Sequence, residues 1–164
     1  MTAESRSSRF VDAERRTIEL VAYREPWFDS LHAMYEGFPG AQRTQGLPPV
    51  TASAIEAWLD AVLEGTNVLA VRDGTVVGHV MFVADDADDA DAHELGVFVH
   101  QDYQGAGIGT SLLKVGFEHA RRAGVDDVWL TVDRSNRRAH ELYQRLGFTA
   151  DVSHARSVRM SRQL

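Results

Sequence analysis

The feature of the sequence that most constrains the fold is "HQDYQGAGIGTSLL", residues 100–113, in which Gly105, Gly107 and Gly109 directly precede an apolar helical pattern. Glycines have no Cβ and adopt dihedral angles that other residues avoid, and the first turn of a helix presents unpaired N–H groups at the positive end of its dipole. Amides that converge in this way bind an anion. The stretch therefore predicts a loop and helix that hold a phosphate or pyrophosphate.

The glycine spacing excludes two familiar nucleotide loops. A Rossmann loop requires G-x-G-x-x-G, whereas the third glycine here comes one residue early and Thr110 takes the required place. A P-loop ends with G-K-[ST], whereas Lys114 lies well inside the predicted helix. The anion must therefore be held by another kind of loop.

The apolar periodicity predicts alternating strands and helices. A hairpin over residues 67–83 turns at Asp73-Gly74, and Ser53 and Glu56 form a capping-box pattern at the start of the second helix. Further strands are predicted at 16–25, 93–99, 128–132 and in a terminal pair near Phe148 and 157–160, and helices at 26–38, 51–65, about 108–123 and 135–147. The fold class is α+β, with a mixed sheet that carries helices.

The composition indicates one globular domain. The 164 residues include no cysteine, which excludes thiolate metal sites and cysteine nucleophiles, and the formal net charge of −7 disfavours nucleic acid and anionic membranes as partners. We expect a polar tail over residues 1–16, a single domain over 17–164 and a cytoplasmic location, and leave a homodimer open. The run Asp85, Asp86, Asp88, Asp89 and Asp91 lacks the spacing of an EF-hand, so we interpret it as a solvated loop and expect no metal.

Two motifs together resemble those of a known family. Gln104, Gly107 and Gly109 fit Q/R-x-x-G-x-G/A, and in "LTVDRSNRRAHELYQRLGF" an asparagine is followed by A-x-x-x-Y-x-x-x-G-F. From about His93 to Phe148 the chain resembles the GCN5-related N-acetyltransferases, the GNAT superfamily; upstream only the order of elements is similar. The resemblance implies a mixed, mostly antiparallel central sheet with a splayed strand pair and about four flanking helices.

The resemblance also implies acetyl-CoA as co-substrate and a role for each matching residue. Val97, Phe98 and Val99 would pair with the pantetheine arm, and Asn136 would contact coenzyme A or brace the strand beside it. Tyr143 would be the acid that protonates the departing thiolate. The pyrophosphate would lie on the loop and its amides, formed by Gln104, Gly105, Ala106, Gly107, Ile108, Gly109 and Thr110.

An amine must lose a proton before it attacks a thioester, and we choose Glu94, at the head of the strand 93–99, as the base. A backbone N–H of Phe98 or Val99 would stabilise the developing oxyanion. Simpler interpretations stay open. Glu94 is equally consistent with a solvated residue at a strand end, which would leave an ordered water as the base. Tyr143 has the helical spacing of a core aromatic, and Asn136 or Ser135 would cap the helix.

The favoured function is therefore transfer of an acetyl group from acetyl-CoA to a primary amine. The acceptor would be a small amine, an amino-acid analogue or a peptide N-terminus. Thr131 stands where the branch that acetylates ribosomal protein N-termini has an acidic residue, which disfavours a protein N-terminus. The alternative is a non-catalytic module that binds or senses acyl-CoA, which would need neither Tyr143 nor a base.

Overall fold

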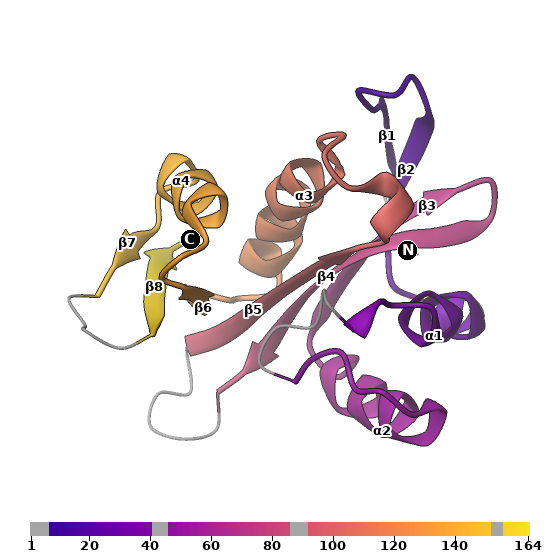
Figure 1. The fold of residues 1–164 in the computed structure, drawn as a ribbon, viewed down its shortest axis with the longest axis horizontal. Coiled ribbons are helices and arrows are strands. Elements are labelled where there is room, and N and C mark those ends of the chain that lie inside the picture. Colours follow the sequence, from indigo (N-terminus) through magenta and orange to yellow (C-terminus); the bar gives the residue numbers. More distant parts are fainter. Residues whose placement is uncertain (1–6, 41–45, 86–91, 152–155) are drawn as a thin grey trace.

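An eight-stranded sheet runs through the centre of the molecule in the order β1-β2-β3-β4-β5-β6-β8-β7 (Figure 1). The computed structural model describes residues 7–40, 46–85, 92–151 and 156–164. In this part of the chain β5 and β6 run parallel and the other neighbouring strands are antiparallel. The strands are β1 (Ser8–Val11), β2 (Thr17–Ala22), β3 (Thr66–Arg72), β4 (Thr75–Ala84), β5 (Ala92–Val99), β6 (Asp127–Asp133), β7 (Thr149–Ala150) and β8 (Ser157–Gln163).

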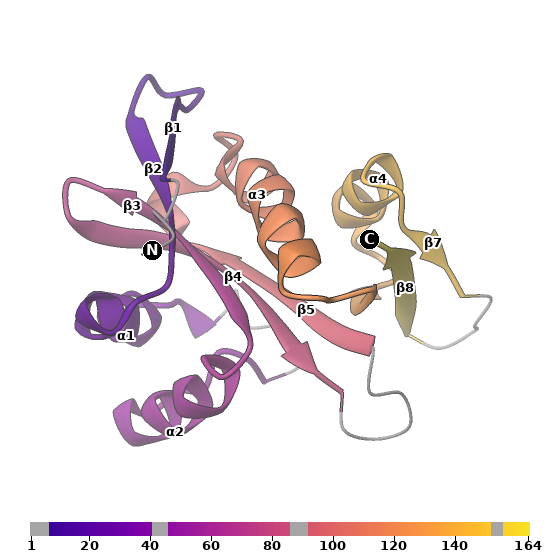
Figure 2. The same ribbon diagram turned by 180° about the vertical axis from the view of Figure 1, so that it is seen from behind.

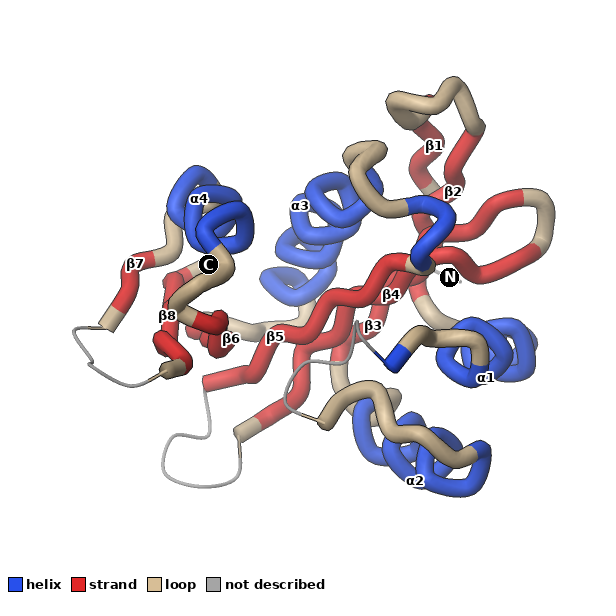
Figure 3. The backbone as a smooth tube through the Cα atoms, in the orientation of Figure 1, coloured by secondary structure: helices blue, strands red, loops and turns tan. Residues whose placement is uncertain are grey.

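Helices cover both faces of the sheet, as Figures 2 and 3 show. On one face lie α1 (Phe28–Glu36), which follows the 3-10 turn η1 (Glu25–Trp27), and α2 (Ala52–Val62). On the other lie α3 (Ile108–Arg122), which follows the 3-10 turn η3 (Gln101–Tyr103), and α4 (Arg137–Arg145). Each face has its own apolar core, so the sheet is the middle of three layers. The α+β class and the mixed, mostly antiparallel sheet are confirmed.

The position of α3 against the sheet depends on a close approach at Gly116. A Cβ built on Gly116 would lie 2.9 Å from Val80 Cγ1 and 3.1 Å from Phe82 Cε2, closer than side chains tolerate. Leu112, Leu113 and Phe117 on the same helix are buried in the core of that face. The absence of a side chain at Gly116 therefore sets how closely α3, with the loop at its N-terminus, approaches the sheet.

Local signals explain most element ends. Asp73 and Gly74 both have positive φ, 48° and 78°, as the tight turn between β3 and β4 requires. The capping box predicted from Ser53 and Glu56 is wrong. The helix begins earlier, since Thr51 is the N-cap and its hydroxyl accepts from the Ala54 N–H at 3.2 Å. Thr51 and Ser53 both have a hydroxyl that can accept from the unpaired amides of the first helical turn. The sequence alone therefore does not decide which of the two is the N-cap.

A strand lies within the segment that we expected to be a polar tail, residues 1–16. Ser8–Val11 forms β1 and pairs with β2 through Phe10 opposite Ile18. The turn that joins the two strands contacts the glycine loop, as described below. In the described part of the chain, no helix is long and apolar enough to cross a bilayer.

Candidate functional site

The site begins where β5 and β6 separate. Their parallel pairing covers Ala92, His93 and Glu94 on β5 and ends where Glu94 lies opposite Trp129. Beyond that point β5 continues along β4 and β6 continues along β8. A cavity of about 690 Å³ opens between the separated strands and is lined by both of them. The splayed pair implied by the resemblance is therefore present, and it frees one edge of β5 from Leu95 to Val99.

The glycine loop lies at the end of β5 and leads into α3. Gly105 and Gly107 have φ of 73° and 90°, a conformation that favours glycine, and a Cβ at either would meet open space. Gly107 is the N-cap, so the amides of Ile108, Gly109 and Thr110 form the first turn and lack an intrahelical acceptor. This is the arrangement of backbone that binds an anion.

Side chains around the loop hold its shape. Gln104 donates through Nε2 to the Val99 carbonyl at 3.0 Å. Ala106 and Ile108 are buried, so of the predicted pyrophosphate ligands these two offer only backbone to a bound molecule. Gly109 lies inside α3, 3.7 Å from Val99 Cγ2 when given a Cβ, and so does not need glycine for its backbone conformation.

The turn between β1 and β2 supports the glycine loop from outside. The buried Asp12 carboxylate accepts from the Arg16 amide at 2.8 Å and from Arg16 Nε at 2.7 Å. Arg16 then donates to the Asp102 carbonyl at 2.9 Å and lies 4.1 Å over the Tyr103 ring. The Ala13 amide donates to the Ala106 carbonyl at 3.1 Å. The sequence analysis missed this support, because its only signal is an Asp–Arg pair four residues apart.

The far wall of the cavity comes from β6, α4 and β8. Asn136 is the N-cap of α4, and its Oδ1 accepts from the Ala139 amide at 3.2 Å. The helix-cap interpretation is confirmed for Asn136, which also lines the cavity, while Ser135 instead donates to Asp133 Oδ1. Capping uses only the amide oxygen, which leaves the Nδ2 donor for a ligand.

Tyr143 lines the same wall and has a dual environment. Its ring packs against Phe148 with centroids 5.5 Å apart, as expected of a core aromatic, yet it also borders the cavity. Burial raises the pKa of the Tyr143 hydroxyl to about 12. The hydroxyl therefore stays protonated at neutral pH and can donate a proton or a hydrogen bond.

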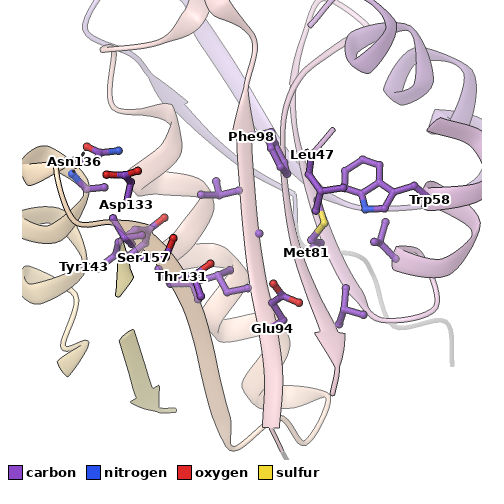
Figure 4. Close-up of a pocket in the computed structure, with 18 residues that line it drawn as sticks. Leu47, Trp58, Met81, Glu94, Phe98, Thr131, Asp133, Asn136, Tyr143 and Ser157 are labelled. Carbon is purple, nitrogen blue, oxygen red and sulfur yellow. Dashed lines mark hydrogen bonds between the residues drawn. The ribbon is translucent and has the colours of Figure 1, made fainter. Parts of the chain in front are cut away.

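Glu94 lies on the opposite side of the opening (Figure 4). Burial raises the pKa of its carboxyl above the ordinary value, the nearby Asp85 carboxylate adds to the rise, and the Arg159 guanidinium opposes it. A glutamate with a raised pKa is a better proton acceptor near neutral pH. The other aspartates of the predicted solvated run lie in 86–91, outside the described residues. No group of three or more metal-binding side chains lies together in the described ranges.

A buried polar chain lies behind this site on the face covered by α1 and α2. Asn67 donates through Nδ2 to the carbonyls of Val62 and Gly65, so its Oδ1 must accept from His79 Nε2 at 2.8 Å. His79 Nδ1 then accepts from the Tyr35 hydroxyl at 2.6 Å. His79 is fully buried, and burial lowers its pKa from 6.5 to about 3. The ring is therefore neutral, with its proton on Nε2.

Comparison with known proteins places this geometry in a family. The sequence model of the acetyltransferase (GNAT) family matches residues 20–148, a range that includes the splayed strands, the glycine loop and α4. The chain belongs to the acetyltransferase (GNAT) family. The resemblance inferred from the two motifs is thereby confirmed, and it extends upstream to β2.

The names of individual proteins that are similar to this chain agree with the family assignment. The mycothiol acetyltransferase of Thermobispora bispora is 39% identical over 98 residues, which are 57% of this chain and 32% of that protein. The chain thus spans about a third of that relative's length. The GNAT domain of S. lividans PAT has a TM-score of 0.79 at 19% identity, over 96% of this chain and 97% of that chain. The structure of yncA from Salmonella typhimurium, described with its cofactor acetyl-CoA, has a TM-score of 0.71 at 22% identity, over 90% and 94%. At these identities the structural matches show the fold.

Several of the predicted site residues of the GNAT chain line one cavity. The cavity between the strands is lined by Glu94, Val97 and Phe98 of β5 and by Asn136 and Tyr143. Val99 and the glycine loop are not part of this lining and lie further along the chain, at the end of β5 and before α3. The sequence analysis missed Trp58, on the other side of β5, and named Phe98 only for the role of its backbone. Trp58 carries no motif, since an apolar residue at helical spacing predicts only core.

Proposed function

We propose that this chain is an acetyl-CoA-dependent N-acetyltransferase that transfers an acetyl group to a primary amine by direct attack on the thioester. The observation that carries the proposal is that Glu94 and Tyr143 line one cavity, on opposite sides of the gap between β5 and β6. One group can take a proton and the other can give one. A non-catalytic acyl-CoA sensor has no need of this pair.

The residues present fit coenzyme A. A pyrophosphate would be held by the amides from Gly105 to Thr110, in a loop with positive φ at Gly105 and Gly107 and open space beside both glycines. The free edge of β5, from Val97 to Val99, would pair with the amides of the pantetheine arm as a neighbouring strand does. Asn136 would add an amide donor from the start of α4.

Acetyl-CoA, when bound, supplies the thioester whose acetyl group the amine accepts. Glu94 would take a proton from the ammonium form of the acceptor, directly or through one water, so that the nitrogen lone pair becomes free. A backbone N–H of Phe98 or Val99 would donate to the carbonyl oxygen as negative charge develops there. The Tyr143 hydroxyl would give its proton to the departing sulfur, which leaves as a thiol. The nitrogen would lose its second proton as the amide forms, and that proton would return to the tyrosinate, directly or through water.

The experiment is a thiol-release assay with acetyl-CoA and a panel of amines and peptides. Because the curated relatives include enzymes named mycothiol acetyltransferase, the panel should include the acceptor of those enzymes. We expect amine-dependent release of one thiol for each acetylated amine, with the product identified by its mass. Tight binding of acetyl-CoA with no thiol release across the panel would favour the sensor instead.

A further inference from the structure

The cavity has two chemically different sides, divided by β5 (Figure 4). One side carries polar groups, including Thr131, Asn136 and the Tyr143 hydroxyl. The other, which we name the apolar compartment, is formed by six side chains from the segment before α2, α2 itself, β4 and β5. They are Leu47, Trp58, Val62, Met81, Val83 and Phe98.

The apolar compartment is open to the cavity. Leu47 is 37% exposed, and the side chains of Trp58 and Phe98 are only partly buried although they pack against the core beneath α1 and α2. Apolar surface that borders a cavity in this way favours a ligand with an apolar group, because the ligand removes that surface from water.

The walls of the compartment are held in place from behind. The Tyr35 ring makes edge contacts with Trp58 and Phe98, with centroids 4.9 Å and 5.7 Å apart, and Trp58 and Phe98 contact each other at 5.9 Å. The Tyr35 hydroxyl is fixed by His79, which Asn67 fixes in turn. The compartment is therefore preformed, and a ligand that fits it does not have to order the side chains.

Gly96 joins the compartment to the gap between the strands. It lies between Glu94 and Phe98 on the same face of β5 and opposite Met81 on β4. A Cβ at Gly96 would lie 3.2 Å from Met81 Cγ and 3.3 Å from Sδ, so any larger residue would narrow the passage. This face of β5 thus runs from Phe98 in the aromatic wall, past Gly96, to Glu94, the proposed base.

The charges of the lining specify the other end of the ligand. The charged side chains in the described lining are Glu94 and Asp133, both acidic. Asp133 Oδ1 already accepts from the Ser135 amide at 2.9 Å and from the Ser135 hydroxyl at 2.6 Å. Asp133 lies across β5 from the apolar compartment, whereas Glu94 shares a face of β5 with Phe98 (Figure 4). Glu94 is therefore the anion that faces the ammonium group of a ligand in the compartment, and a carboxylate on the ligand would meet repulsion.

We infer that the acceptor is a primary monoamine with an aromatic or branched aliphatic body and no carboxylate. Its body would lie against Trp58, Met81 and Phe98, and its ammonium group against Glu94. The inference rests on the proposed function and narrows its acceptor to one chemical class. It also makes Trp58 and Gly96 specificity-determining residues, one as the wall and the other as the passage.

Three amines separate the features of this inference. Phenethylamine has the apolar body and the amine, phenylalanine adds a carboxylate, and ethanolamine lacks the apolar body. We expect kcat/KM for phenethylamine to exceed that for each of the others by about 10-fold or more, since a buried apolar group discriminates by this order. Binding of phenethylamine in the presence of CoA, measured by calorimetry, gives a second readout independent of turnover.

Two variants locate the selectivity. Trp58→Ala and Gly96→Val should each lower kcat/KM for phenethylamine by about 10-fold or more and that for ethanolamine by much less, so that the ratio of the two values falls. Val50→Ala is the matched control, because Val50 is 71% exposed and lies outside the cavity lining. Because Trp58 also packs on Tyr35, melting temperatures are compared. If Trp58→Ala does not fold, Gly96→Val carries the test, since the three atoms nearest to an added Cβ all belong to the Met81 side chain and not to backbone.

The outcomes separate the two proposals. Equal or greater kcat/KM for phenylalanine or ethanolamine would overturn the inferred acceptor class and leave the acetyltransferase intact. Loss of activity toward all amines alike in both variants would also overturn the inference, since selectivity would not reside at Trp58 and Gly96. If no amine releases thiol, the proposed function fails, and calorimetry still decides the inference. Binding of phenethylamine that Gly96→Val abolishes supports it, and no binding overturns it.

Discussion

The stability of the protein should depend on pH through His79. The ring is fully buried and neutral, donating to Asn67 Oδ1 and accepting from the Tyr35 hydroxyl. Its pKa is 6.5 in a model peptide and about 3 in the folded protein. Because the folded pKa is the lower one, protons bind preferentially to the unfolded state. The contribution of His79 is fully present above pH 6.5 and is lost as pH falls toward 3.

The size of the effect follows from the pKa difference. Each pKa unit corresponds to about 1.4 kcal/mol, so the full shift of about 3.5 units corresponds to about 5 kcal/mol. Only part of this range is needed for a measurement. Between about pH 7.5 and about pH 4.5, His79 should remove about 3 kcal/mol from the free energy of unfolding, because its unfolded form is almost fully protonated at the lower pH.

The measurement is urea denaturation of the wild type and His79→Gln at several pH values in this window. Glutamine has an amide donor and acceptor but does not titrate, so the other ionisable groups contribute equally to both proteins. We expect the stability advantage of the wild type to shrink by about 3 kcal/mol as pH falls, whatever its value at neutral pH. A difference that stays constant within about 0.5 kcal/mol would refute a buried, neutral His79.

Four further predictions concern the proposed site. Gly107→Glu should weaken CoA binding in calorimetry by about 100-fold or more, since it adds a charge at the anion site and a side chain at φ 90°. Gly74→Glu, with φ 78° in the turn between β3 and β4, is the control and should bind normally. Tyr143→Phe should lower kcat by about 10-fold or more with CoA affinity unchanged; unchanged kcat with a lower melting temperature would make Tyr143 structural. Glu94→Gln should depress turnover most at low pH and recover partly as pH rises, because more amine is then neutral; a pH–rate profile merely scaled from the wild type would identify water as the base. Arg16→Leu should weaken CoA affinity several-fold without changing kcat, since Arg16 supports the loop through the Asp102 carbonyl; unchanged affinity would show that the support is dispensable.

The sequence by itself determined the features that are encoded locally. Glycines before a helix, an Asp-Gly turn and apolar periodicity each report on backbone conformation within a few residues. They therefore predicted α3, the β3–β4 hairpin and the anion-binding loop. The two motifs that resemble the GNAT family lie in the same region, from His93 to Phe148. There the spacing along the chain translates directly into the placement of Gly107 at the start of α3 and of Asn136 and Tyr143 in the wall of the cavity.

Only the tertiary structure decided which distant residues meet. Asp12 and Arg16 look like part of a polar tail, yet β1 pairs with β2 and brings their turn against the glycine loop. Trp58 and Phe98 are 40 positions apart, but α2 packs on the face of the sheet to which the Phe98 side chain of β5 points, and this brings the two rings to 5.9 Å. The pKa of His79 is likewise invisible in the sequence, because burial sets it. A pattern along the chain records local backbone preference, whereas contacts between separate elements and the desolvation they cause arise only when the elements pack.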